Sequence, residues 1–253
     1  MFNKEGRKTE RAHWDASWQL PIRARIPSRL NASVLNYTRL VGKHVRPGNR
    51  YLEIGCAPGK LLAWAASVLK AECTGLDYSE TGIAKCRALF DALGLKVNLY
   101  HIDFFDHRLQ PSSFDVVTSF GFIEHFDDPG PVVQKHLDLV KPGGVALIAV
   151  PNYGGVYGSL QRWCDAPNLA LHNLDIMNPD ALTALIDSPD VESVRAYPFG
   201  AMSLWIVNLD NRFPRPLANL ISLVANTIGL LQPLTINALA PMLVLEVRKR
   251  AAT

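Results

Sequence analysis

The feature of this sequence that most constrains its fold is a regular alternation of apolar runs and amphipathic stretches between residues 51 and 150. Short apolar runs predict buried strands, and apolar residues three or four positions apart predict helices. Their alternation is typical of a parallel sheet with helices on both faces. The predicted elements are strands 51–54, 72–76, 97–102, 114–119 and 144–150 and helices 59–70, 80–93 and 130–140.

Two less regular segments flank this α/β core. Prolines interrupt residues 1–50, and the helical spacing between Arg29 and His44 predicts a helical cap there. Beyond residue 152 the pattern predicts a helix at 179–187, a strand at 191–197 and a last strand at 242–248. The expected domains are an N-terminal helical cap (1–50), the core (51–152), and a substrate cap with closing strands (153–253).

The composition argues against several classes of protein. With 48% hydrophobic and 19% charged residues the chain is typical of a globular protein, and its net charge of +3 is too small to indicate nucleic acid as a partner. The four cysteines lack CxxC pairing and clustered histidines, so we expect neither a metal site nor a disulfide framework. The charged N-terminus lacks the apolar core of a secretory signal, which makes the cytoplasm the expected compartment.

Charge is distributed unevenly along the chain. The first 30 residues hold seven Arg or Lys against three acids, which suits an anionic ligand or surface, although such segments are more often simply solvated. By contrast, Pro216 to Leu245 contains no charged residue. Prolines and amides divide this stretch into apolar runs that are well short of the ~20 residues that a membrane span needs.

A glycine turn directly follows the first core strand. Gly55 and Gly59 lie between that strand and the next helix, where backbone N–H groups at a helix N-terminus can face a ligand. The dinucleotide fingerprint GxGxxG would require glycines where Ala57 and Lys60 stand, so a diphosphate cofactor such as NAD is the lesser hypothesis. Glu53 favours a nucleoside site, and a turn without a ligand is the remaining alternative.

The next two strands both lead into an aspartate. Asp77 emerges at the carboxyl edge beside the glycine turn, where it can accept hydrogen bonds from both ribose hydroxyls. Asp103 emerges at the next edge position and can accept from an adenine amino group, with Phe104 or Tyr78 against the ring face. Taken singly, Asp77 could instead stabilise a helix N-terminus, and Asp103 could belong to a solvated turn.

Histidine and tryptophan side chains supply further candidates. His125 follows the fourth strand and could accept a proton from a hydroxyl or amine, or it could serve a structural role with its ring bonded to a carbonyl. His172 and Tyr153 are weaker candidates in the region after the core. Trp14 and Trp18 share one helical face, for which we favour core packing of the N-terminal cap over closure of the ligand pocket.

Taken together, the motifs at successive strand ends resemble those of the class I S-adenosylmethionine (SAM)-dependent methyltransferases. The likeness covers about residues 50–152 and is strongest to the small-molecule branch that contains the ubiquinone and menaquinone biosynthetic O- and C-methyltransferases. In that family the last strand of a seven-stranded, mostly parallel sheet is antiparallel. The motifs are Leu52–Gly59, Leu76–Ser79, Asp103, Phe114–Val117, Gly121–His125 and Leu139–Gly144 followed by Pro151–Asn152.

The resemblance implies SAM as cofactor and a methyl transfer to an O or N nucleophile of a small-molecule acceptor. It places Glu53, Gly55 and Gly59 on the methionine side of SAM, and Phe120 and Gly121 beside the reacting methyl group. A SAM-binding protein without catalysis and an NAD-dependent oxidoreductase are the rival hypotheses. The full set expected to bind the cofactor is Glu53, Gly55, Cys56, Ala57, Gly59, Asp77, Tyr78, Asp103, Phe104, Phe120 and Gly121, with His125 as the catalytic candidate.

We expect residues 200–240 to cap an at least partly apolar acceptor rather than to anchor the chain in a membrane. Six apolar residues recur at helical spacing and would form the face that packs on the domain, opposite Asn219, Asn226 and Thr227. No Lys or Arg stands among them to meet anionic lipid, as in an interfacial anchor. A substrate pocket, a homodimer interface and shallow membrane contact are the alternatives. The six are Leu217, Leu220, Ile221, Val224, Ile228 and Leu231.

Overall fold

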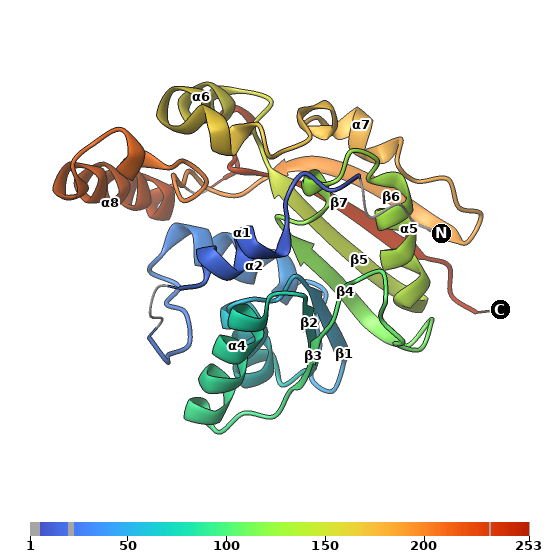
Figure 1. The fold of residues 1–253 in the computed structure, drawn as a ribbon. Helices are drawn as coiled ribbons and strands as arrows, with labels where there is room; N and C mark the ends of the chain where they lie inside the picture. Colours follow the sequence, from blue (N-terminus) through green and yellow to red (C-terminus); the bar gives the residue numbers. More distant parts are fainter. Residues whose placement is uncertain (1–5, 20–22, 233, 253) are drawn as a thin grey trace.

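In the part of the chain that the computed structural model describes, residues 6–19, 23–232 and 234–252, seven strands form one sheet. Its order is β3-β2-β1-β4-β5-β7-β6, and β7 runs antiparallel to both of its neighbours (Figure 1). This confirms the predicted Rossmann-like sheet with an antiparallel last strand. The strands are β1 (Arg50–Ile54), β2 (Glu72–Asp77), β3 (Asn98–His101), β4 (Phe114–Phe120), β5 (Val140–Pro151), β6 (Val191–Phe199) and β7 (Met242–Lys249).

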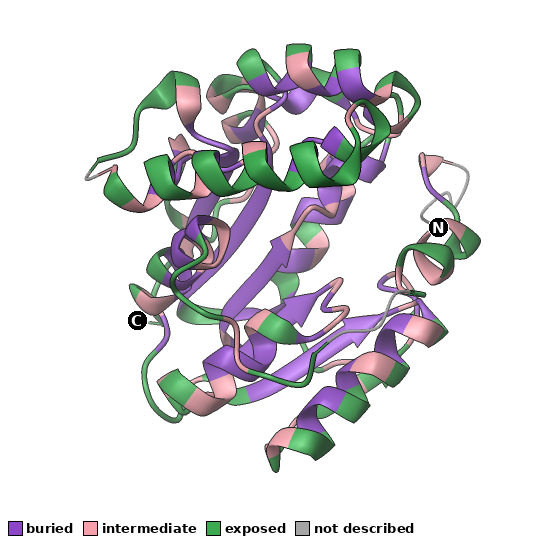
Figure 2. Cartoon of the chain, turned by 90° about the vertical axis from the view of Figure 1, so that its left-hand side faces the viewer, coloured by how far each residue is buried: buried purple, intermediate pink, exposed green. Residues whose placement is uncertain are grey.

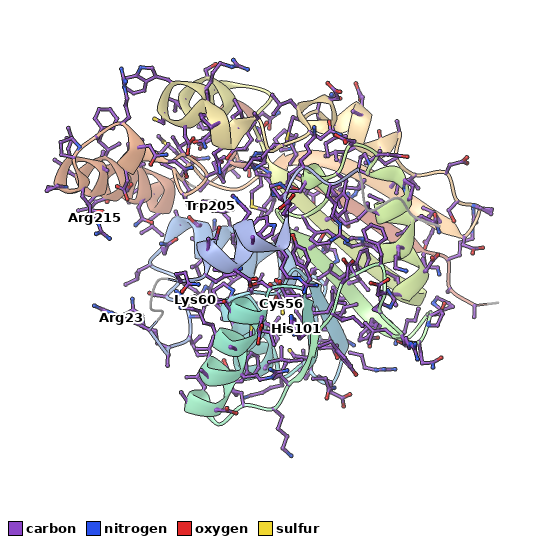
Figure 3. The ribbon with its side chains drawn as sticks, in the orientation of Figure 1. Arg23, Cys56, Lys60, His101, Trp205 and Arg215 are labelled. Carbon is purple, nitrogen blue, oxygen red and sulfur yellow. The ribbon has the colours of Figure 1, made fainter. Side chains whose placement is uncertain are left out.

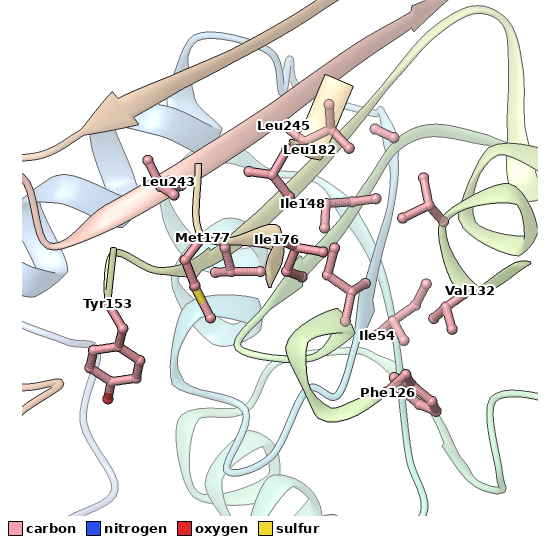
Figure 4. Close-up of a cluster of buried hydrophobic side chains, with 14 of the residues drawn as sticks. Ile54, Phe126, Val132, Ile148, Tyr153, Ile176, Met177, Leu182, Leu243 and Leu245 are labelled. Atoms are coloured by element: carbon pink, nitrogen blue, oxygen red, sulfur yellow. The ribbon is translucent and has the colours of Figure 1, made fainter. Parts of the chain in front are cut away.

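Helices cover both faces of this sheet, as the alternating pattern predicts. Alternate side chains of β5 therefore enter two separate cores. Val145 and Leu147 pack with α2, α3 and α4, whereas Ile148 and Val150 pack with α5, α6 and α7 in the core that Figure 4 shows in part. The helices are α1 (Arg11–Ser17), α2 (Ala32–Gly42), α3 (Lys60–Trp64), α4 (Glu80–Leu93), α5 (Gly130–Leu139), α6 (Val156–Leu169), α7 (Pro179–Thr183) and α8 (Arg215–Leu231).

Capping residues set the helix boundaries next to the glycine turn. The Ser79 hydroxyl accepts a hydrogen bond from the Gly82 N–H at 3.0 Å, and Gly94 ends α4 with a φ of +61°. The helix predicted over 80–93 therefore has the observed bounds. The helix predicted over 59–70 begins one residue later as α3 and ends in a π-helical turn, Ala65–Leu69.

Helix α6 is the main element that the sequence pattern did not predict. We assigned no element between residues 152 and 179; Gly158, within this helix, packs directly on the Tyr153 carbonyl, where no side chain would fit. Pro167 lies within α6, and the backbone at Asp165 is non-helical, so the helix is kinked there. Gly158 therefore permits close packing inside the helix.

Helix α8 is turned the opposite way from our expectation. Five of the six residues predicted to pack inward are between 43% and 78% exposed, and Figure 2 shows α8 as a long, mostly green helix. Its inward face consists of Ala218, Ala225 and Gly229, and Gly229 packs closely on the Met202 carbonyl. The amide of Asn226 also faces inward, since it accepts from the Ala32 N–H at 2.7 Å and donates to the Leu30 carbonyl at 3.1 Å.

The predicted orientation was wrong because hydrophobicity alone assigned the larger side chains to the core. Small residues let α8 approach its neighbours more closely, and Asn226 satisfies an N–H at the start of α2 that lacks a partner within that helix. Among the described helices, none has both the length and the apolar character needed to cross a membrane.

Candidate functional site

A cavity of about 370 Å³ lies at the carboxyl ends of the central strands. Strand order reverses between β1 and β4, and ligands of open α/β sheets bind at such a point. Loops after β1 to β5 line the cavity, together with α1 and the segment before it, which lie beside the strand arrowheads in Figure 1. Trp205 lies on the α8 side of the cavity and Cys56 on the α4 side (Figure 3).

The glycine turn forms one wall of this cavity. Gly55 has a φ of +69°, which favours glycine, and its N–H donates to the Leu76 carbonyl at 2.9 Å. Gly55 and Ala57 line the cavity, but Glu53, Cys56 and Gly59, which we also expected at the cofactor, do not. The Cys56 side chain packs toward Gly75 in the core, and Gly59 packs against Cys86 of α4.

Glu53 lies behind the turn, at the end of β1. The side chain is buried, and its Oε2 atom has no hydrogen-bond partner among the described residues. Burial, and then the charge of Asp77, raise the pKa of Glu53 to about 8. A buried polar atom without a hydrogen-bond partner destabilises the folded chain, and a ligand that supplies the partner removes this cost.

Asp77 lies between the glycine turn and α4. Its carboxylate accepts the Ser79 N–H at 2.9 Å and the Ala57 N–H at 3.1 Å. Burial raises the pKa of Asp77, and the backbone hydrogen bonds act in the opposite direction. Each carboxylate oxygen can accept a second hydrogen bond, so these contacts orient Asp77 without using up its capacity for a ligand.

Asp103 forms an ion pair that sequence reasoning missed. The Arg7 guanidinium approaches Asp103 Oδ1 at 2.6 Å and lies 5.4 Å from the centre of the Tyr78 ring. Phe104, the next residue, is buried, with its ring centre 5.6 Å from that of Phe122. The excess of basic residues near the N-terminus was the available signal, but nothing in the local sequence joins residue 7 to residue 103.

The N-terminal segment closes the cavity from above. The Lys8 N–H donates to the His125 carbonyl at 2.9 Å, and Asp15 accepts the Ser79 hydroxyl at 2.6 Å. Trp14 and Trp18 line the cavity, so the core packing that we favoured for them is wrong. The helix α1 is too short and too exposed to have a core of its own. Within the described residues, the buried Trp18 Nε1 lacks an acceptor.

Glu124 and His125, which follow β4, and His172, which follows α6, meet in another wall of the cavity. His125 Nδ1 lies 2.9 Å from the Leu171 carbonyl, which only accepts, so Nδ1 carries the proton and Nε2 is an acceptor. Burial, and then His172, lower the pKa of His125 to about 3. Glu124 is fully buried 3.9 Å from His125 Nε2, burial raises its pKa to about 8, and neither oxygen has a partner in the described chain.

The same three side chains could hold a divalent cation, although the sequence predicted no metal site. Their ligating atoms all lie within 4.8 Å of one another. The Nδ1 atom of His172 contacts the Asn168 carbonyl at 2.9 Å, so both imidazoles are oriented by backbone carbonyls, as metal-bound histidines usually are.

The remaining wall is largely apolar. Phe120 ends β4 and Gly121 follows it, and both line the cavity together with Trp205 and Ile206. The Tyr153 hydroxyl donates to the Ile206 carbonyl at 2.6 Å, which favours a structural role for this tyrosine. The cavity therefore has polar groups toward β1 to β3 and at Glu124, His125 and His172, and an apolar wall at Phe120, Trp205 and Ile206.

This arrangement is the one that ligand-binding α/β proteins place at the switch point of the sheet. Residues 52–148 match the model of the methyltransferase domain family. The ubiquinone biosynthesis O-methyltransferase of Vibrio atlanticus is 33% identical over 141 residues, which cover 55% of this chain and 56% of that protein. The chain thus spans about half the length of the curated relatives that it matches.

Solved structures share the fold at low sequence identity. A SAM-dependent methyltransferase from Archaeoglobus fulgidus has a TM-score of 0.57 at 16% identity, with 97% of each chain covered. The Haemonchus contortus phosphoethanolamine N-methyltransferase 2 in complex with S-adenosyl-L-methionine has a TM-score of 0.59 at 17% identity, covering 85% of this chain and 52% of that one. Sequence motifs, the family match and the shared fold identify residues 52–148 as a class I SAM-dependent methyltransferase domain.

Proposed function

We propose that this protein is an enzyme that transfers the methyl group of SAM to an oxygen or nitrogen nucleophile of a small-molecule acceptor. The observation that carries the proposal is that Asp77, Asp103 and His125 follow three different strands and yet line one cavity. Its volume of about 370 Å³ suits small ligands. The name of the Vibrio relative, an O-methyltransferase of ubiquinone biosynthesis, supports transfer to an oxygen nucleophile.

The residues present fit SAM at both ends. Asp77 can accept from the ribose hydroxyls and Asp103 from the adenine amino group, with Tyr78 and Phe104 beside the ring. Glu53 Oε2 and Trp18 Nε1, both buried without a partner among the described residues, can serve the polar groups of the cofactor. Cys56 and Gly59 would not contact SAM and would instead shape the turn that presents Gly55 and Ala57. Phe120 and Gly121 would lie nearest the methyl group.

When bound, SAM supplies an electrophilic methyl group on a sulfonium sulfur. The acceptor's O–H or N–H proton would pass to Nε2 of His125, which faces the cavity unprotonated. Burial holds the pKa of His125 at about 3 in the folded chain, so this role requires the Glu124 carboxyl, 3.9 Å away, to be ionised and to stabilise the imidazolium. Alignment of acceptor and methyl group supplies much of the rate, so His125 assists a reaction that positioning already favours.

The apolar wall indicates the nature of the acceptor. Trp205 and Ile206 come from the segment after β6, the region that we expected to cap the acceptor site. An acceptor with a nucleophilic group near His125 and an apolar body against Trp205 would match both halves of the cavity. The helix α8 does not line this cavity, so the proposed cap is the 205–208 segment alone.

A calorimetric titration followed by mass spectrometry tests this function. We expect SAM to bind and NAD⁺ not to bind, since the loop lacks the dinucleotide glycines. A gain of one methyl group in a candidate acceptor would then separate the enzyme from a SAM-binding protein without catalysis. Binding of NAD⁺ in preference to SAM would contradict the proposal.

Binding of a divalent cation by Glu124, His125 and His172 is the second candidate function of these side chains, and their spacing supports it. A bound cation would lower the pKa of an acceptor hydroxyl and make a base unnecessary. Elemental analysis of the purified protein, with methyl transfer measured after chelation, separates the two roles. Loss of transfer that one cation restores supports the cation, and unchanged transfer supports His125 as the base.

The cytoplasm is the compartment that we propose for this enzyme. All four cysteines are buried and free. Free thiols are the usual state of cysteine in the reducing cytosol. Expression of a tagged full-length chain followed by cell fractionation tests this assignment.

A further inference from the structure

The outward face of α8 plays no part in the site described above. Leu220, Leu223 and Val224 are 56%, 61% and 52% exposed, and Leu234 continues the apolar surface at 77%. Exposed apolar patches of this extent mark an interaction surface in most proteins. We call it the α8 face, and it consists of Leu217, Leu220, Leu223, Val224, Ile228, Leu231, Leu234 and Ile236.

A basic hollow of about 670 Å³ adjoins the end of this face. Its walls come from α2, from the end of α3 and the π-helical turn after it, from the end of β6, and from the chain just after α8, including Leu234. Arg29, Arg39 and Lys43 line it, and among the described residues around it there is no acid. The sequence alone showed no cation within α8, but the fold brings these three beside it, through the contact of Asn226 with the Leu30 carbonyl.

The opposite end of α8 carries an aromatic and basic cluster. Trp163 is 51% exposed, and its ring centre lies 5.4 Å from that of Phe213. The Arg212 guanidinium lies 4.9 Å from the centre of the Trp163 ring. Tryptophan is enriched where proteins meet the headgroup region of a bilayer, and basic residues are typical of the polar side of membrane-surface helices. Arg215 and Arg23 both project from the α8 side of the molecule in Figure 3.

We infer that the α8 face and the basic hollow bind the surface of a bilayer that contains anionic phospholipid. The leucines would enter the headgroup boundary, while Arg29, Arg39 and Lys43 meet lipid phosphates. With 17 residues, α8 is about 25 Å long and lies in the plane of the surface. A second copy on the same face would bring like charges together, which disfavours a homodimer there. The inference is independent of the proposed methyl transfer.

Vesicle flotation of the full-length protein tests this inference. We expect the protein to float with mixed phosphatidylcholine and phosphatidylglycerol vesicles, to bind pure phosphatidylcholine more weakly, and to lose binding as salt rises. The double variant Arg29→Glu/Arg39→Glu should weaken binding to mixed vesicles by about fivefold or more for each cation. Lys96→Glu/Arg108→Glu changes the net charge equally at exposed positions outside this surface and should leave binding nearly unchanged.

Substitutions in α8 test the apolar half. Leu220→Ser/Leu223→Ser should weaken binding by about tenfold or more, with unchanged circular dichroism because both side chains are exposed. Failure of the unmodified protein to float with mixed vesicles would overturn the inference. So would a dimer in sedimentation that the Leu220→Ser/Leu223→Ser variant dissociates, since a second copy would then cover the α8 face.

Discussion

The cavity at the strand ends and the helix α8 are both rich in apolar residues, yet their side chains are placed by different rules. In the cavity, each functional residue is fixed by its distance from the end of a buried strand, as Asp77 and Asp103 are. In α8, two opposite faces could each have packed inward. The face with Ala225 and Gly229 packs on the domain, because close approach and the Asn226 amide outweigh the burial of larger side chains.

The largest effect that we expect concerns His125 in the polar wall of the cavity. His125→Ala should lower the single-turnover rate of methyl transfer by about 10²- to 10⁴-fold, because the acceptor proton loses its base. SAM affinity should stay nearly unchanged, since His125 would face the acceptor. His125→Gln keeps the shape but cannot take the proton. Near-normal rates for both variants, with unchanged pH profiles, would assign His125 a structural role.

A smaller effect is expected at the ribose. Asp77→Ala should weaken SAM binding by about 1.5–3 kcal/mol, the usual value of a hydrogen bond to a charged group. Calorimetry measures this directly. Asp91→Ala, an exposed change on α4, is the matched control and should bind SAM normally. Equal affinity of the Asp77 variant and the control would remove Asp77 from the site.

Burial of Glu53 makes the ligand-free protein sensitive to pH. Its pKa is about 8 in the folded chain, above the ordinary value of 4.5, so the folded state holds a proton that the unfolded state releases. Stability is therefore present at low pH and falls by roughly 1.4 kcal/mol per pH unit as pH rises between these values. Glu124, whose pKa is also about 8, contributes in the same range, so denaturant unfolding of Glu53→Gln should show a slope that is smaller by this amount. Glu72→Gln, exposed on β2, should keep the full slope.

The smallest effects distinguish the two faces of α8. Leu223→Ser should change the free energy of unfolding by less than about 0.5 kcal/mol, because the side chain is exposed. Gly229→Ala should cost about 1–3 kcal/mol, because the added methyl group meets the Met202 carbonyl. Urea denaturation measures both. A larger loss for the leucine variant would mean that its face packs inward after all.

The sequence predicted the core of this fold well because each signal there is local. A buried strand shows as an apolar run, and a residue at its end must lie at the sheet edge, which brought Asp77 and Asp103 to one cavity. The role of Arg7 could not be predicted, since it depends on where a distant segment crosses the sheet. Trp14 and Trp18 were misassigned for the same reason: helical spacing shows that two side chains share a face but not what that face meets.

A crystal structure of the protein with S-adenosylhomocysteine tests the central claim most directly. We predict the adenosine between Asp77 and Asp103, beneath Trp18, with the sulfur directed toward Gly121 and the Glu124–His125 wall. Density for the nucleoside outside this cavity, or inside it with Asp77 and Asp103 both out of contact, would contradict the account.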